Sequence, residues 1–345
     1  MAKLISSKRA TIHDVAERAG VSYQTVSRVL NDHPSVAEAT RARVNEAIKA
    51  LNYYPNSAAR DLAARQSRLI GVISCNLADY GPTQMLINVE QSARRAGYDL
   101  IFANVDPTNR KSTAAAADLI RRWSVAGVII LAPVRSAAYD HMLRQLENIP
   151  HVQLDVPKTD SPTEPSVIID QFIGIQLVTE HLIGLGHTRI ATIAMSDIWF
   201  SADARLKGYQ ATMRDAGLEP LIIGSGDWSS MSGYAVMKAW GSKLDFTALV
   251  VANDQMALGA IYALQEMGLR VPHDISVTGF DDVPESRFFS PALTTVRQDF
   301  SLLGLRGLEY LQRLIDDELA PVTEQLIIQP DLIIRDSTAA PAGHS

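Results

Sequence analysis

Residues 11–30 read TIHDVAERAGVSYQTVSRVL, and this stretch determines how the amino-terminal part of the chain folds. Thr11 caps a helix start with Asp14 as its partner three residues later, and apolar residues then recur at helical spacing. Gly20 tolerates the positive φ found where helices end, and Ser22 caps a second helix. Two short helices joined by a tight glycine turn predict a helix-turn-helix.

The second helix of this motif has an apolar face, formed by Val26, Val29 and Leu30, and a polar face. Polar side chains on such a helix bond base edges and phosphates, and the helix itself fits a major groove. The alternative is a helical hairpin inside a larger core, but a core hairpin has no need for this polar face. We therefore predict a DNA-binding surface that comprises Thr11, Ser22, Tyr23, Gln24, Thr25, Ser27, Arg28 and Asn31.

The distribution of charge agrees with this prediction, although the net charge of −6 at first argues against nucleic-acid binding. Residues 1–68 carry 11 Lys and Arg against 6 Asp and Glu, whereas the rest of the chain carries 21 against 32. A basic head neutralises phosphates, while an acidic body stays soluble and does not adhere to DNA.

Composition indicates an ordinary globular protein of two or three compact units. Its apolar runs are shorter than the roughly 20 residues that a membrane span needs, and the amino terminus lacks an apolar signal-peptide core. We therefore expect a cytoplasmic protein. The single Cys75 cannot form an internal disulfide and is expected in a buried strand; the eight histidines are scattered, and no metal site is predicted.

The segment after the helix-turn-helix predicts a third helix over residues 38–51 and then a break at Pro55. A short helix, SAARDLAA, follows at residues 57–64, with Leu62 as its only large apolar residue. So short a helix is unstable alone in water, which favours a hinge that folds when it docks. A solvated linker is the alternative.

From Leu69 onward, short apolar runs alternate with longer helical segments, which predicts an α/β core of two doubly wound parallel-sheet lobes. Polar residues and one Trp follow the strands, at the ends that face a cleft in such folds. Carboxylates, amides, an Arg and an aromatic ring suit a sugar, whereas no acid pair or triad indicates an enzyme. Helix caps and turns are the alternative explanation for the Asp and Asn residues. These positions are Asn76 to Pro82, Asp155, Ser196 to Arg205, Asp227, Trp228, Asn253 to Gln255, Asp281 and Asp282.

Several segments resemble the LacI/GalR family of bacterial repressors, nearest to its lactose-responsive members. They include residues 11–31, LNYYPNSAARDLAARQSRLIGV from Leu51, HLIGLGHTRIA from His181, GDWSSMSGY from Gly226 and VANDQMALGAIYAL from Val251. The resemblance covers about residues 11–334. It implies a DNA-binding head, a hinge helix, a core like that of periplasmic sugar-binding proteins, use as a dimer, and a galactoside inducer without any cofactor.

Residue by residue, the resemblance places Tyr23, Gln24 and Arg28 at the operator-selecting positions of the recognition helix. It adds the hinge residues Asn56, Ala59 and Leu62 to the DNA contacts, with Leu62 as a minor-groove wedge. Effector contacts are implied at Pro82, Met85, Asp155, Ser201, Arg205, Trp228, Asn253, Gln255, Asp281 and Phe300.

The predicted boundaries are a head at residues 1–54, a hinge helix at 55–67, a core at 68–336 and a flexible tail at 337–345. Within the core, the N-lobe comprises about 68–167 and 299–326, and the C-lobe about 168–298 and 327–336. Ala37 stands where the family usually has a capping Ser or Thr for the third helix. The chain lacks a leucine-heptad tail, so we expect a dimer. The alternatives are a family member that responds to another sugar or to a purine corepressor, and a sugar receptor without DNA function.

Overall fold

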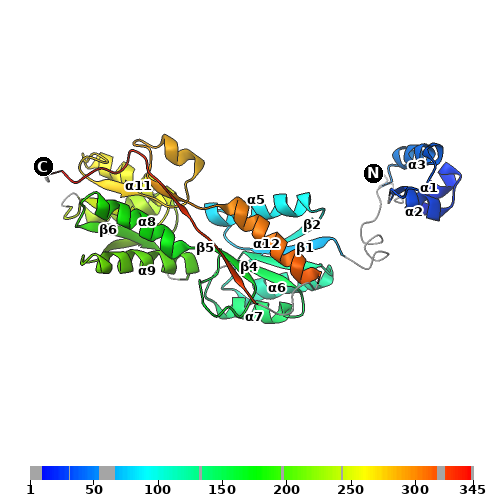
Figure 1. The fold of residues 1–345 in the computed structure, drawn as a ribbon, viewed down its shortest axis with the longest axis horizontal. Coiled ribbons are helices and arrows are strands. Elements are labelled where there is room, and N and C mark those ends of the chain that lie inside the picture. Colours follow the sequence, from blue (N-terminus) through cyan, green and yellow to red (C-terminus); the bar gives the residue numbers. More distant parts are fainter. Residues whose placement is uncertain are drawn as a thin grey trace, which may run out of the picture. The chain divides into compact units, whose positions relative to one another are not determined.

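The computed structural model describes residues 10–30, 32–53, 67–131, 134–195, 198–241, 244–316 and 323–342. The chain divides into two compact units, residues 1–67 and 68–345, called the head and the core below (Figure 1). Asn31, Asn56, Ala59 and Leu62, and the predicted hinge apart from Ser67, lie outside the described residues.

The head contains three helices, α1 Ile12–Ala19, α2 Tyr23–Leu30 and α3 Glu38–Leu51. A capping box begins α1: Thr11 N donates to Asp14 Oδ2 at 2.7 Å, and Asp14 N donates to Thr11 Oγ1 at 3.3 Å. Gly20 ends the helix with φ of 63°. The predicted helix-turn-helix is therefore present, with its turn at the glycine.

A small apolar core holds the three head helices together. Val15, Val26 and Val44, one from each helix, are fully buried in it. Ala37 makes no side-chain cap for α3. Arg41 instead ties the start of α3 to the preceding turn, because it pairs with Asp32 and donates to the His33 carbonyl at 3.0 Å.

The N-lobe of the core is a six-stranded parallel sheet in the order β11-β5-β4-β3-β1-β2. Alternate residues of its strands face opposite sides: Ile70 packs with α5 and α12, and Ile73 packs with α6 and α7. Helices therefore cover both faces (Figure 1). The strands are β1 Leu69–Ser74, β2 Asp99–Asn104, β3 Gly127–Leu131, β4 His151–Leu154, β5 Ser166–Ile169 and β11 Gln325–Ile328, and the helices are α5 Tyr80–Arg95, α6 Arg110–Arg122, α7 Ala137–Leu146 and α12 Phe300–Ile315.

The C-lobe is a four-stranded parallel sheet in the order β7-β6-β8-β9, again with helices on both faces. Helices α8 and α9 share one apolar cluster with this sheet, and α10 and α11 share another. The strands are β6 Ile190–Met195, β7 Leu221–Gly226, β8 Ala248–Val251 and β9 Ser276–Thr278, and the helices are α8 Gln171–Gly184, α9 Phe200–Asp215, α10 Ser230–Trp240, α11 Asp254–Glu266 and the short 3₁₀ helix Pro284–Phe288.

Three connections carry the chain between the lobes: from β5 to α8, from β10 Thr295–Arg297 to α12, and from β11 to β12 Asp331–Ile333. Strands β10 and β12 form an antiparallel pair. The predicted lobe limits at 167 and 326 fall inside β5 and β11, which stay in the N-lobe sheet to Ile169 and Ile328. The predicted fold class, a helical head with two doubly wound parallel lobes, is confirmed.

Helix α5 begins at Tyr80 and includes Pro82 in its first turn, where a missing N–H costs no helical hydrogen bond.

One expectation about the end of the chain needs correction. The expected flexible tail does not begin at Ser337. Ser337 is fully buried, its Oγ donates to the Val277 carbonyl at 2.6 Å, and Ala339 N donates to Ser276 Oγ at 3.0 Å.

Candidate functional site

The free face of α2 is polar and accessible. Ser22, Gln24 and Arg28 are exposed, and Tyr23 is 51% exposed beside the His13 ring, with 5.6 Å between the ring centres. Thr11 is exposed, and Thr25 and Ser27 are half-buried. The hydroxyls of Ser22 and Thr25 lie 3.0 Å apart, so they form a local pair at the start of the helix. Of the predicted DNA contacts that the structure describes, all except Thr11 therefore lie in α2 or at its N-cap.

A cleft in the core is lined from both lobes. Its empty space, which includes open solvent at the mouth of the cleft, is about 510 Å³. The two lobes also touch beside it: Val134 of the N-lobe and Trp199 of the C-lobe form an antiparallel β-bridge. The lining residues are Asp79, Tyr80, Gly81, Pro82, Met85, Asp155, Trp199, Ser201, Arg205, Trp228, Asn253, Asp281, Gln298 and Phe300.

Arg205 is the most constrained side chain of this cleft. It is 5% exposed, its Nε donates to Gln171 Oε1 at 2.9 Å, and its Nη1 donates to the Ala252 carbonyl at 2.5 Å. Its Nη2 lies 3.5 Å from Asp281 Oδ1. The guanidinium also lies 3.8 Å from the centre of the Phe280 ring and 5.3 Å from that of Trp228. Its orientation is therefore set before any ligand arrives.

Two glutamines complete a ring of hydrogen bonds around Arg205. Gln171 Nε2 donates to Asp155 Oδ1 at 3.1 Å and to Gln298 Oε1 at 2.7 Å. Gln298 Nε2 in turn donates to Asp281 Oδ1 at 2.6 Å. Gln171 begins α8 and Gln298 follows β10, so both lie at connections between the lobes. The polar floor of the cleft is consequently built on these connections.

Burial dominates the titration of the carboxyls in this ring. It raises the pKa of Asp155 to about 7 and that of Asp281 to about 6, although Arg205 opposes both shifts. Burial also lowers the pKa of Arg205, against the pull of Asp281 and Asp155. The site thus contains carboxyls that take up or release a proton near neutral pH.

Backbone strain gathers at the same place. Asp155, Trp228 and Asp281 have φ of 60°, 73° and 114°, in a region that side chains other than Gly rarely adopt. Each residue follows a strand, and each lines the cleft. Strain of this kind persists where the surroundings over-determine it, as they do at binding sites.

The structure brings nine of the ten predicted effector residues to this cleft and leaves Gln255 out of the lining. Gln255 Oε1 accepts a hydrogen bond from Asn253 Nδ2 at 2.9 Å, so it orients a lining residue instead. Asp79, Tyr80 and Gly81 follow β1, and Trp199 follows β6, so these four lie in the strand-end segments 76–82 and 196–205 that the sequence predicted to face a cleft, although none was among the ten effector contacts. Sequence reasoning missed Gln171 and Gln298.

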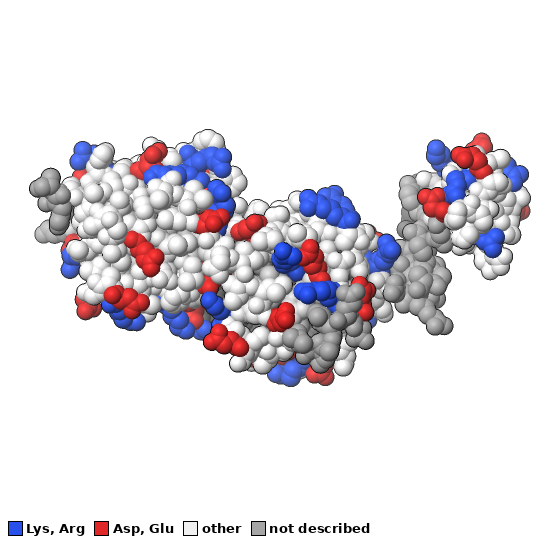
Figure 2. Space-filling model, in the orientation of Figure 1, with Lys and Arg blue, Asp and Glu red and all other residues white. Residues whose placement is uncertain are grey.

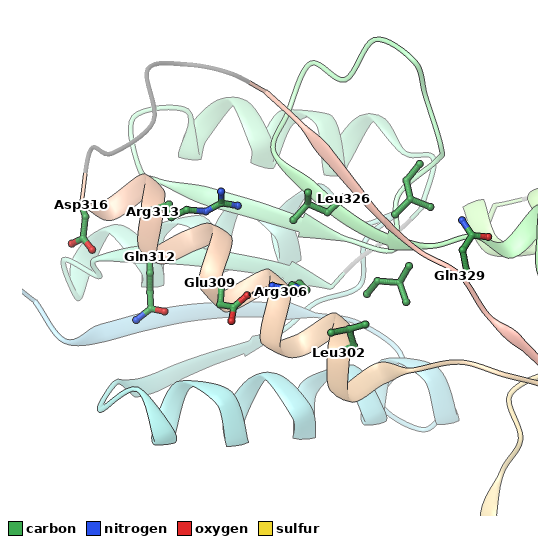
Figure 3. A pocket seen from close by; sticks show the side chains of 10 residues that line it. Leu302, Arg306, Glu309, Gln312, Arg313, Asp316, Leu326 and Gln329 are labelled. Carbon is green, nitrogen blue, oxygen red and sulfur yellow. Dashed lines mark hydrogen bonds and ion pairs between the residues drawn. The ribbon is translucent and has the colours of Figure 1, made fainter.

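Another hollow lies on the outside of the N-lobe, between α12 and β11 (Figure 3). Arg306, Glu309, Arg313 and Asp316 of α12 line it, beside Leu326 of β11. It is an open groove along the edge strand β11, and it lacks the buried polar ring of the cleft. We therefore assign the effector site to the cleft.

The surface of the core shows a mixture of charges. On the face drawn in Figure 2, basic and acidic side chains are interspersed over both lobes. A footprint for nucleic acid would be a patch or stripe of one sign. Among the described helices, none is both long and apolar enough to cross a membrane.

Comparison with known proteins matches two family models. Residues 11–56 match the model of bacterial regulatory proteins of the lacI family, and residues 179–338 match a periplasmic binding protein-like domain. The chain is 38% identical to the lactose operon repressor of Escherichia coli K12, over 97% of this chain and 92% of that protein. It is 35% identical to the HTH-type transcriptional repressor PurR of Histophilus somni, over 95% of this chain and 98% of that protein.

A comparison with solved structures finds a similar fold. A crystal structure of the lac repressor dimer bound to operator and the anti-inducer ONPF superposes with a TM-score of 0.88 at 38% identity, covering 96% of this chain and all of that one.

Proposed function

Since the chain belongs to the LacI family of bacterial DNA-binding transcriptional repressors, we propose that it binds a pseudo-palindromic operator as a dimer and releases it when a galactoside enters the cleft. The head supplies the DNA contacts and the core supplies the effector site. The relatives reported above are transcriptional regulators, which agrees with a function in binding rather than in turnover.

The free face of α2 supports the DNA contacts of this proposal. Tyr23, Gln24 and Arg28 are exposed together, and they combine hydrogen-bond groups for base edges with a guanidinium for guanine or phosphate. The dimer would place two such helices in successive major grooves, about one helical turn apart.

The main support for a sugar effector is that one cleft combines aromatic rings with polar groups already oriented by hydrogen bonds. Asp155, Arg205, Asn253 and Asp281 offer donors and acceptors for neighbouring hydroxyls. Trp228 and Phe300 offer flat apolar surface for the carbon face of a sugar ring. Similarity to the lactose operon repressor supports a galactoside among the sugars.

Release follows from linkage. A sugar that binds more tightly to one arrangement of the lobes disfavours the arrangement that grips DNA by the same coupling free energy, typically about 1–3 kcal/mol. The hinge helix predicted around Leu62 is the proposed bistable element, because so short a helix would be unstable alone in water.

A purine corepressor is the second candidate, supported by the similarity to PurR and by the two rings that a base could contact. The two candidates predict opposite signs: a galactoside inducer weakens operator binding, whereas a purine corepressor strengthens it.

Fluorescence anisotropy of a labelled symmetric lactose-type operator tests both, at fixed salt, with the chain alone, with a non-metabolised galactoside and with a purine base. We expect tight binding that the galactoside reverses. Tight binding that no galactoside changes would reject the effector, and no specific binding would reject the operator type.

A further inference from the structure

Asp79 introduces a carboxylate into the cleft from the N-lobe. It occupies the N-cap position of α5 and lines the cleft, but its side chain makes no cap hydrogen bond to the helix. Its hydrogen-bond partner is Asn76, whose Nδ2 lies 3.4 Å from Asp79 Oδ2. The carboxylate is therefore not used by the helix that it begins.

The lining as a whole is acidic. Asp79, Asp155 and Asp281 contribute carboxyls, whereas Arg205 is the only cation among the described lining residues. The guanidinium already faces Asp281 and lies on the Phe280 ring, so its charge is largely balanced within the wall. The carboxyls that this pairing leaves unbalanced are Asp79 and Asp155, so an incoming ligand meets a negative field chiefly from the N-lobe.

The titration of these carboxyls agrees with their crowding. The pKa of Asp79 is raised by burial and, more weakly, by the charge of Asp227, while Asn76 opposes the shift. The charge of Asp79 in turn contributes to the raised pKa of Asp281. An anion in the cleft would add to this repulsion, and an ammonium group would relieve it.

We infer that the cleft selects its effector by charge, accepting neutral and amino sugars and rejecting anionic ones such as sugar phosphates, and that Asp79 sets this selection from the N-lobe. The inference rests on the proposed sugar-binding function and names the class of sugar. A like charge brought against a fixed charge is a common way to exclude a competing ligand.

Isothermal titration calorimetry on the full chain provides the test, with two matched series: galactose, galactosamine and galactose 6-phosphate, and glucose, glucosamine and glucose 6-phosphate. In the series that binds, we expect the amino sugar to bind at least as tightly as the parent sugar. The phosphate should bind roughly tenfold or more weakly, the equivalent of about 1.4 kcal/mol.

Asp79→Asn keeps the shape of the side chain and removes its charge, so it should reduce the discrimination against the phosphate severalfold. Asp99→Asn is the matched control, because Asp99 is an exposed acid at the opposite end of the same sheet. Circular dichroism of each variant checks that it folds.

The outcomes separate the two hypotheses. A phosphate that binds as tightly as its parent sugar overturns charge selection, and equal losses for all ligands in Asp79→Asn overturn the role of Asp79. If only the glucose series binds, with the phosphate weakest, the galactoside effector is rejected and charge selection is kept. If galactose binds but its phosphate is not weaker, the galactoside effector is kept and charge selection is rejected. If neither series binds, both hypotheses are rejected.

Discussion

The carboxylate of Asp203 in the C-lobe lies 2.6 Å from the guanidinium Nη2 of Arg135 in the N-lobe. Beside this ion pair, Arg135 N donates to the Ile198 carbonyl at 3.0 Å. Lys207 also reaches Asp203, at 2.9 Å, and the two cations hold the pKa of Asp203 below its ordinary value despite burial. The rim of the cleft thus carries a direct polar contact between the lobes.

Breaking this contact should cost little stability, because half of the Arg135 side chain is exposed and solvent screens the pair. We expect a double-mutant cycle of Arg135→Ala and Asp203→Ala to give a coupling free energy of about 0.5–1 kcal/mol. Urea unfolding of the four proteins measures it. A coupling near zero would mean that the backbone bridge alone joins the lobes here.

Replacing Arg205 by Lys should abolish the response to effector while leaving operator binding intact. A compact ammonium cannot reach Gln171, Ala252 and Asp281 together, as the planar guanidinium does. We also expect a loss of about 1–3 kcal/mol in the free energy of unfolding, from buried acceptors left unpaired.

The operator anisotropy assay reports the response. Arg189→Lys is the control, because Arg189 forms an exposed ion pair with Asp245 in the same lobe. Normal release of operator by the Arg205 variant would reject the assignment of the site.

The stability of the core should depend on pH through Asp155. Its pKa is about 7 in the folded chain against an ordinary 3.8, so between these values the folded state holds a proton that the unfolded state has released. The free energy of unfolding therefore falls as the pH rises through this window, by at most about 1.4 kcal/mol per pH unit from this group.

Asp155→Asn should flatten that dependence between about pH 4 and 7, and Asp281, with a pKa of about 6, should keep a smaller slope of the same sign. Urea unfolding at a series of pH values tests this. Parallel curves for the two proteins would contradict it.

Helices α10 and α11 approach so closely at Gly259 that a side chain does not fit. An added Cβ would lie 1.8 Å from the Ser230 carbonyl oxygen, which is backbone and cannot rotate away. Gly259→Ala should cost about 3 kcal/mol. Gly184→Ala, at the end of α8 with open space around it, should instead gain about 0.5–1 kcal/mol. Equal thermal shifts for both variants would refute the packing argument.

Sequence reasoning predicted the helix-turn-helix, the two lobes and most of the cleft, because caps, periodicity and strand ends are local signals. Gln171 and Gln298 escaped it, since their role depends on two segments that are far apart in the chain and meet only in the fold. Gln255 followed a strand as expected but bonds to its neighbour Asn253. Ser337 looked like a loose terminus, yet its partners Val277 and Thr294 lie in other segments.

The hydrogen bond between Gln171 and Gln298 joins two of the three connections between the lobes, and the lobes would rotate about these connections. A ligand that engages Arg205 would therefore bind close to the connections between the lobes. A rotation of a few degrees about these connections would displace the far end of a lobe much more than the floor of the cleft. In the proposed mechanism, rotation of a rigid lobe would therefore carry the effect of a bound ligand to the far end of that lobe without a long relay of side chains.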